Sequence, residues 1–331
     1  MPKVAVIVPV YNVEEFLGEC IDSIITGSFA DFSLYLVDDC STDGSYQIML
    51  DYARKDSRIR IFQTKTNSGV GAPRNLALDN LADEEFLAFI DSDDVVAHNY
   101  LELLLHAQAQ SGADIVQSNW LILQENADGD YIKKEEKIGQ RAVTLPDSRK
   151  MRMRMLVEDK LPVEATQKLI RRSLFDEHNL RFAIRTAEDL LLMVPLTYYA
   201  PKIVWIPFYG YHYRQHPNSV MHKTDLTKAR HSLVSQMQAL KQLEIYLADF
   251  DLDFNLKYEL RLFIARRIFY NMFAWPCGNL DKEELLNLAA EVFSEHGGDM
   301  QGLLCYFFKE YLLQRDKDKS IKKARKHLGL D

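Results

Sequence analysis

Carboxylates crowd together at residues 91–94 of this 331-residue chain, directly after the apolar run of residues 86–90. Like charges this close repel one another and lose solvation when buried. A hard cation such as Mg²⁺ or Mn²⁺ prefers oxygen ligands and relieves the repulsion. Magnesium takes one or two carboxylates and completes its shell with water and substrate phosphates. Asp91 and Asp93 therefore predict a metal site for a phosphorylated substrate, although aspartates can also cap a helix.

Two further polar stretches contain residues suited to ligand binding. Asp38 and Asp39 follow a second apolar run, where a carboxylate can accept a hydrogen bond from a nucleobase N–H or a ribose hydroxyl; forming the turn is the alternative role. In the stretch NSGVGAPRN (67–75), Gly69 and Gly71 let the backbone approach a ligand, and Arg74 can meet a phosphate or a base. The stretch is no GxGxxG fingerprint, so a dinucleotide site is not predicted.

Strands and helices alternate over the first hundred residues and would position these side chains. Residues 3–10 form a continuous β-branched run, which is typical of a strand buried on both faces. Residues 33–37, 58–62 and 85–90 are the next three predicted strands. The segments between them have helical spacing. This alternation predicts a doubly wound α/β fold with a mostly parallel sheet flanked by helices. Because ligands bind at the carboxyl ends of such strands, the polar clusters should gather at one edge.

The rest of the chain divides into a mixed region and a helical region. Residues 113–123 and 201–207 are predicted strands, residues 147–160 a helix, and residues 128–137 a polar hairpin or loop. From residue 226 onward the pattern is helical only. We therefore predict two domains, a catalytic domain over residues 1–222 and an all-α region over residues 223–331.

Composition narrows the function classes. The chain is 47% hydrophobic with a formal net charge of −8, which argues against nucleic-acid binding. Its four cysteines form no CxxC pair and indicate a reduced, cytoplasmic setting. The apolar N-terminal run is short and lacks a cleavage pattern, and a membrane span needs about 20 apolar residues, more than any run here.

Four motifs, in order and spacing, resemble those of family 2 glycosyltransferases with the GT-A fold: VIVPVYN (6–12), LVDDCSTDGS (36–45), NSGVGAPRN (67–75) and FIDSDD (89–94). The resemblance is dense over residues 3–95 and thinner over residues 165–220. It implies transfer of a sugar from a nucleotide-diphosphate donor to an acceptor hydroxyl, with inversion at the anomeric carbon.

The resemblance also implies roles for individual residues. Asp39 would meet the base, usually uracil, with Asp38 in support. Asp91 would reach the ribose or metal-bound water, and Asp93 would ligate Mn²⁺ or Mg²⁺. The full implied nucleotide-binding set is Pro9, Tyr11, Asn12, Asp38, Asp39, Asn67, Arg74, Asp91 and Ser92.

An inverting transfer needs a general base, because a sugar hydroxyl must lose its proton as it attacks. The family places this base in a Glu-Asp pair about a hundred residues after the metal motif. RTAEDLLLM (185–193) fits, with Asp189 as the base and Glu188 orienting the acceptor or the base. Acidic residues at a helix N-terminus are the alternative interpretation.

The segment YGYHYRQHPNSV (209–220) resembles a family segment that closes over the diphosphate. Arg214, His216 and Ser219 would contact phosphate oxygens, and His216 could complete the metal shell. A surface strand followed by a turn is the alternative. TQKLIRRSLF (166–175) resembles a segment beside the acceptor pocket, where Lys168 would face donor or acceptor.

Some positions depart from the family pattern. Cys40 replaces a frequent Gly, Pro73 replaces a small residue, and Thr166-Gln167 replaces a frequent Trp-Asn. The last departure leaves the acceptor side open. No Gln-x-x-Arg-Trp motif is present, so addition of one sugar per encounter is expected rather than processive synthesis.

Two other functions are alternatives to sugar transfer. A sugar-phosphate nucleotidyltransferase would carry a basic Gly-rich loop after its first strand, which PVYNVEEF (9–16) does not supply. A non-catalytic nucleotide-sugar-binding subunit would not need an intact Asp189 and Asp93.

The resemblance implies a role in bacterial surface polysaccharide or glycoprotein glycan assembly, and this role indicates the partners. The donor would be a UDP-sugar, and the acceptor a lipid-linked or protein-linked saccharide. The basic segment 315–326 could contact anionic lipid on the inner face of the membrane, or form a solvated helix. The aromatic-rich helices near residues 256–275 and 303–313 are core or a homodimer interface.

Overall fold

The computed structural model of the chain describes residues 3–125, 131–135, 141–183, 188–215, 226–273 and 282–296. The chain forms two compact units, Met1–His216 and Pro217–Asp331. The predicted boundary between residues 222 and 223 lies outside the described residues.

The N-terminal unit is built on one large sheet with the strand order β3-β2-β1-β4-β9-β6-β10-β5, with β7 on β6 and β8 on β10. The strands are β1 (Val4–Val10), β2 (Phe32–Asp38), β3 (Ile59–Gln63), β4 (Phe86–Phe89), β5 (Val95–Val96), β6 (Ile115–Glu125), β7 (Tyr131–Glu135), β8 (Val143–Thr144), β9 (Lys168–Arg171) and β10 (Ile203–Gln215).

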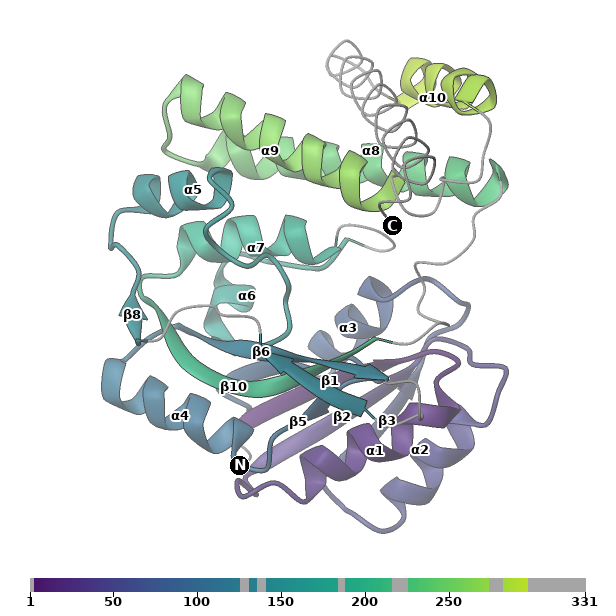
Figure 1. Cartoon of the computed structure of the whole chain (residues 1–331), viewed down its shortest axis with the longest axis vertical. Coiled ribbons are helices and arrows are strands. Elements are labelled where there is room, and N and C mark those ends of the chain that lie inside the picture. The colour runs from purple at the N-terminus through teal and green to yellow at the C-terminus, as the bar shows by residue number, and fades with distance from the viewer. Residues whose placement is uncertain are drawn as a thin grey trace, which may run out of the picture. The chain divides into compact units, whose positions relative to one another are not determined.

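Helices cover both faces of this sheet (Figure 1). In Figure 1, α1, α2 and α4 lie on one side, and α3, α6 and α7 lie on the other. The helices of the N-terminal unit are α1 (Glu14–Ile25), α2 (Ser45–Ala53), α3 (Gly71–Leu78), α4 (Tyr100–Ser111), α5 (Arg149–Val157), α6 (Ser173–Glu177) and α7 (Glu188–Tyr199). The predicted α/β sheet flanked by helices is thus confirmed.

The central strand β1 explains why the sheet forms. All seven of its residues are buried, as expected for an apolar strand covered on both faces. Alternate residues, Val4, Val6, Val8 and Val10, join one core cluster with apolar side chains of α1 and α4. This period of two follows from the alternation of side chains along a strand.

Parallel pairing brings the polar ends of the strands together. β1 pairs in parallel with β2, where Val10 lies opposite Asp38, and with β4, where Ile7 lies opposite Phe89. The residues that follow each strand therefore emerge at one edge of the sheet.

The second half of the sheet differs from the sequence-based expectation. β9, not predicted as a strand, runs antiparallel between β4 and β6. Its four residues are too short for a periodic signal, so pairing partners decide their conformation. β10 continues past the predicted strand 201–207 to Gln215, and it includes most of the segment assigned to diphosphate binding. The polar segment 128–137 contributes β7, which pairs antiparallel with β6.

The described residues of the C-terminal unit are helical, as predicted. Its helices are α8 (Leu226–Asp249), α9 (Phe254–Phe273) and α10 (Lys282–His296). Leu233, Leu240 and Leu247 on α8 are buried, which is the helical spacing of one apolar face. No helix within the described ranges is long and apolar enough to span a bilayer.

Candidate functional site

A single buried guanidinium joins three carboxylates at the carboxyl edge of the sheet. Arg74 Nη2 donates to Asp91 Oδ1 at 2.7 Å, and Nη1 donates to Asp189 Oδ1 at 2.7 Å and to Glu188 Oε1 at 3.4 Å. The Arg74 side chain is only 2% exposed. Glu188 and Asp189, which include the predicted general base, lie about a hundred residues after the predicted metal loop (residues 91–94). Arg74 therefore brings these two distant segments together.

Three separate elements supply these groups. Arg74 lies on α3, which packs against β1 and β2. Asp91 lies just beyond β4, and Glu188 and Asp189 form the first turn of α7. Acidic side chains are favourable there, because the helix dipole places partial positive charge at an N-terminus.

The far end of α7 is held by another buried arginine. Arg152 on α5 donates to the carbonyl oxygens of Thr197, Tyr198 and Ala200, at 3.0, 3.4 and 2.8 Å. The last carbonyls of a helix lack intrahelical partners, so a guanidinium satisfies them well. The predicted helix over residues 147–160 thereby fixes the end of α7 opposite to the acidic pair.

Burial and charge crowding raise two carboxyl pKa values in this cluster. Desolvation is the largest cause at Asp91, whose pKa rises to about 6 although Arg74 lowers it. Desolvation, followed by the neighbouring Asp189, raises the pKa of Glu188 to about 7. One arginine therefore does not fully compensate the carboxylates, and the site favours an additional positive charge.

Asp94, which sequence reasoning left without a role, fixes the metal loop. Its buried carboxylate accepts from the Tyr211 hydroxyl at 2.5 Å and from the Arg214 backbone N–H at 2.8 Å. The Tyr211 hydroxyl oxygen in turn accepts from the Asp91 backbone N–H at 3.1 Å. The density of aspartates in residues 91–94 was the available signal, but only the hydrogen bonds from β10 and the burial of the side chain show that Asp94 faces inward.

Arg214, a predicted diphosphate ligand, lies against the same loop. Its Nε donates to the Asp93 carbonyl at 2.8 Å, and Nη2 pairs with Glu19 at 2.5 Å. Its guanidinium also lies 5.1 Å from the centre of the Phe16 ring. His216 and Ser219, the other predicted diphosphate contacts, lie outside the described residues.

The donor set of the loop fits a magnesium-type ion better than a structural metal. Among the described residues, no three His, Cys, Asp or Glu side chains converge into a complete metal site. Asp91 and Asp93 supply hard oxygens, and a cation sharing its shell with substrate phosphates needs only one or two such groups. These residues would hold Mn²⁺ or Mg²⁺, which would supply positive charge beside a leaving diphosphate.

Asp38 and Asp39, which are predicted to bind the nucleobase, hold neighbouring loops in place. Asp39 accepts from Thr64 Oγ1 at 2.6 Å, from the Ser68 N–H at 3.0 Å and from the Gly69 N–H at 2.8 Å. Asp38 accepts from Gln63 Nε2 at 2.8 Å. Both carboxylates are buried, and they hold the loops after β2 and β3 together at the sheet edge.

The remaining predicted nucleotide contacts lie near the same edge. Asn12, with a φ of 50°, accepts through Oδ1 from the Thr42 N–H at 2.7 Å. Tyr11 is 44% exposed beside it. Pro9 and Ser92 are buried, and Asn67 is exposed.

Lys168, expected to face donor or acceptor, is buried near Asp189. Burial lowers its pKa to about 8, with the charges of Glu164 and Asp189 opposing that change. Its Nζ donates to the Glu164 carbonyl. Thr166 bridges to Phe89 at the end of β4, so this departure from the family pattern lies beside the metal loop.

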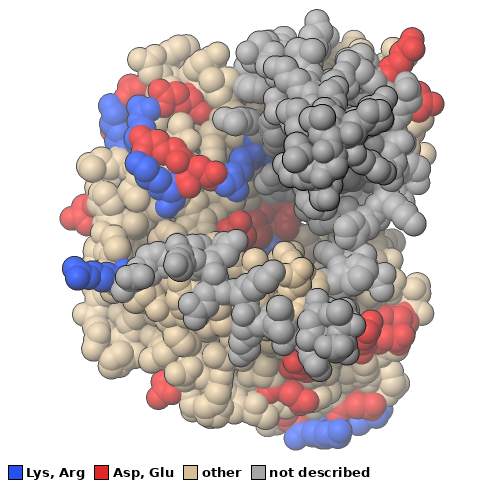
Figure 2. All heavy atoms as spheres, viewed as in Figure 1, with Lys and Arg blue, Asp and Glu red and all other residues tan. Residues whose placement is uncertain are grey.

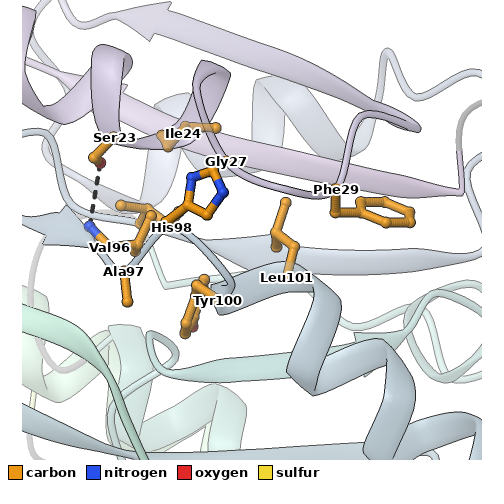
Figure 3. A pocket seen from close by; sticks show the side chains of 10 residues that line it. Ser23, Ile24, Gly27, Phe29, Val96, Ala97, His98, Tyr100 and Leu101 are labelled. Carbon is orange, nitrogen blue, oxygen red and sulfur yellow. Dashed lines mark hydrogen bonds between the residues drawn. The ribbon is translucent and has the colours of Figure 1, made fainter.

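A crevice elsewhere in the unit is too small to be the donor site. It lies between the end of α1 and the start of α4 and has a volume of about 10 Å³, room for one water molecule. Figure 3 shows its labelled lining, including His98 beside Gly27, and the hydrogen bond from the Val96 N–H to Ser23 Oγ at 3.1 Å. Figure 2 shows one face of the molecule, on which the described Lys and Arg side chains lie in small groups with Asp or Glu nearby.

Comparisons with known proteins show which family the chain resembles. The chain is 31% identical over 222 residues to the uncharacterized glycosyltransferase EpsJ of Bacillus subtilis, covering 66% of this chain and 63% of EpsJ. It is 30% identical over 217 residues to the poly(ribitol-phosphate) beta-glucosyltransferase of Bacillus spizizenii, covering 64% of this chain and 32% of that protein. The chain thus spans less than two thirds of these relatives.

The fold is also known from solved structures. The crystal structure of Staphylococcus aureus TarS 1–349 in complex with UDP-GlcNAc has a TM-score of 0.67 at 20% identity, covering 97% of this chain and 92% of that chain. The family model for glycosyl transferase family 2 matches residues 5–178, more than half of the chain. This chain belongs to glycosyl transferase family 2.

Proposed function

We propose that this protein transfers a sugar from a UDP-sugar to an acceptor hydroxyl, with inversion and with Mn²⁺ or Mg²⁺ as cofactor. Asp189 is the general base in this proposal, Asp93 and Asp91 serve the metal, and Asp39 and Asp38 serve the base of the nucleotide. The observation that carries it is the link through Arg74, which lies 2.7 Å from both Asp189 and Asp91. In an inverting transfer the base and the metal act on opposite faces of one sugar, so both must border the same donor site, and Arg74 links them there.

The chemistry follows from these positions. Asp189 takes the proton of the acceptor hydroxyl while the hydroxyl oxygen forms its bond to the anomeric carbon. The bond between that carbon and the diphosphate oxygen breaks with its electron pair, and UDP leaves. Arg214, next to the metal loop, adds positive charge on the side of the diphosphate. Attack and departure on opposite faces of the sugar give inversion.

The donor class is supported by the relatives. TarS has been crystallised with UDP-GlcNAc and with UDP. The relatives include a poly(ribitol-phosphate) beta-glucosyltransferase and a poly(ribitol-phosphate) beta-N-acetylglucosaminyltransferase. We propose UDP-hexose or UDP-N-acetylhexosamine donors and a lipid-linked or protein-linked saccharide acceptor in bacterial surface-glycan assembly.

The proposal places the enzyme in the cytoplasm, at the inner face of the membrane. The basic segment 315–326 that would contact lipid lies outside the described residues, and so do parts of the aromatic helices that would form a homodimer. Sedimentation with anionic vesicles and measurement of the oligomeric state test these two points.

A donor screen tests the function. UDP or GDP release is measured from a panel of UDP- and GDP-sugars, with Mn²⁺ and with EDTA. We expect release from at least one UDP-sugar that stops with EDTA. Release that is indifferent to EDTA would contradict the metal role, and release only from GDP-sugars would contradict the donor class.

A further inference from the structure

We infer that Arg74 is a positioning residue that ties the predicted base Asp189 to the metal loop at Asp91, rather than a direct ligand of the nucleotide. The inference rests on the proposed function, since it assigns Arg74 a part in the same reaction. It goes beyond that function because it states that Arg74 fixes the position of Asp189 relative to Asp91.

The two terminal nitrogens of Arg74 serve two different elements. Nη2 binds Asp91, at the end of β4, and Nη1 binds Asp189 and Glu188, in the first turn of α7. The planar guanidinium holds its donors at a fixed angle. The separation between Asp91 and Asp189 is therefore set by the shape of one side chain.

The surroundings of Arg74 keep it in place. Its guanidinium lies 5.1 Å from the centre of the Phe182 ring. Asn75, the next residue of α3, holds the backbone of Phe182 from both sides: Nδ2 donates to its carbonyl at 3.0 Å, and Oδ1 accepts from its N–H at 2.9 Å. A side chain packed this way, and 2% exposed, offers little surface to a nucleotide.

The charges around Arg74 are a second reason why position 74 needs an arginine. Asp91, Asp189 and Glu188 would repel one another without a cation between them. A lysine would supply the charge as a single point, but it would not reproduce two hydrogen-bonding directions at once. Arg74→Lys should therefore fold and still misplace the base.

Binding and turnover distinguish positioning from nucleotide contact. In full-length Arg74→Lys, we measure the Kd of UDP with Mn²⁺ by calorimetry and the rate of UDP release from saturating UDP-sugar, with water as the acceptor. We expect the release rate to fall about 100-fold, because small misplacements of a catalytic group have effects of that size. We expect the Kd to stay within about threefold.

A matched control is available in the same unit. Arg58 is a partly buried arginine bound to Asp56 at 2.6 Å, in the loop before β3 and outside the candidate site. Arg58→Lys should leave both the release rate and the Kd unchanged. If Arg74→Lys instead raised the Kd at least about tenfold with an unchanged saturating rate, Arg74 would be a nucleotide ligand and the inference would be overturned.

A second arm does not depend on finding the donor. Thermal unfolding midpoints are compared for wild type, Arg74→Lys, Asp189→Asn and the double variant. Residues in direct contact couple, whereas independent sites add. We expect the midpoint shift of the double variant, relative to wild type, to differ clearly from the sum of the two single-variant shifts. Additive shifts would overturn the link even if the transferase activity were established, and coupled shifts without UDP binding would count against the proposed function alone.

Discussion

Two neighbouring parts of the sheet edge treat their carboxylates differently. After β2, Asp39 accepts hydrogen bonds from Thr64, Ser68 and Gly69, which are all neutral donors of the protein. After β4, Asp91 meets Arg74 and other carboxylates, and its pKa rises to about 6. The first part is satisfied as it stands, whereas the second carries more negative charge than its surroundings compensate.

This difference agrees with the two tasks that we propose for the two parts. A carboxylate that accepts several backbone and hydroxyl donors holds loops in shape, which suits the recognition of a flat, uncharged base. Carboxylates crowded around one arginine suit a cation and a diphosphate, which cancel the charge.

Asp189→Asn, in the carboxylate cluster around Arg74, should lower the turnover number more than any other substitution tested. Removing a general base costs on the order of 10³-fold in rate. The turnover number with the donor found in the screen is the measurement, and UDP binding should persist. Glu158→Gln, which removes an exposed partner of Lys160, is the control. Wild-type turnover in Asp189→Asn would show that another group takes the proton.

Asp93→Asn should also act on turnover, with a smaller loss. A metal ion supplies several kcal/mol of charge stabilisation, so weakened ligation should cost about 10²-fold at limiting Mn²⁺. Titration of activity with Mn²⁺ measures the change, and excess metal should restore part of it. An unaltered Mn²⁺ requirement would remove Asp93 from the metal site.

The stability of the metal-free protein should fall as pH rises through the carboxyl cluster. Folding raises the pKa of Glu188 from 4.5 to about 7 and that of Asp91 from 3.8 to about 6. A raised pKa means that the folded state holds its protons longer, so the stabilisation is complete below the unfolded pKa and is lost above the folded one. With screening at the partly exposed Asp91, the loss between pH 4.5 and 7 should be about 1 to 3 kcal/mol.

Urea unfolding at about pH 5 and about pH 7.5 measures this loss. Glu188→Gln should reduce the pH dependence, because the amide does not titrate, and Mn²⁺ should stabilise more at the higher pH. An unchanged slope in Glu188→Gln would mean that other groups dominate.

Cys40, in the hydrogen-bonded part, should show the smallest effect. Its φ of 62° lies in the left-handed region, where a glycine is unstrained and a β-branched residue is not. Cys40→Gly should change the free energy of unfolding by less than about 1 kcal/mol, because relief of strain offsets added chain entropy. Cys40→Val should cost about 1 to 2 kcal/mol. Equal effects of the two variants, measured by urea unfolding, would contradict a backbone requirement at this position.

The order of elements followed from local pattern. The apolar run of β1, the helical spacing of α1 and the polar residues after β2 and β4 are properties of short segments, so periodicity revealed them. β9 was missed, and the extension of β10 was one of two alternatives left open for residues 209–220, because the conformation of both depends on pairing with β4 and β6.

The alternation of strands and helices, the acidic clusters at strand ends and the family motifs are all readable in the amino-acid sequence. Hydrophobic period and residue type are local quantities that can be read without a partner. Only the tertiary structure decided that Arg74 joins Asp91 to Asp189 and that Asp94 faces Tyr211. Contacts between residues up to 117 positions apart depend on how the strands are ordered in the sheet, and no local pattern contains that order.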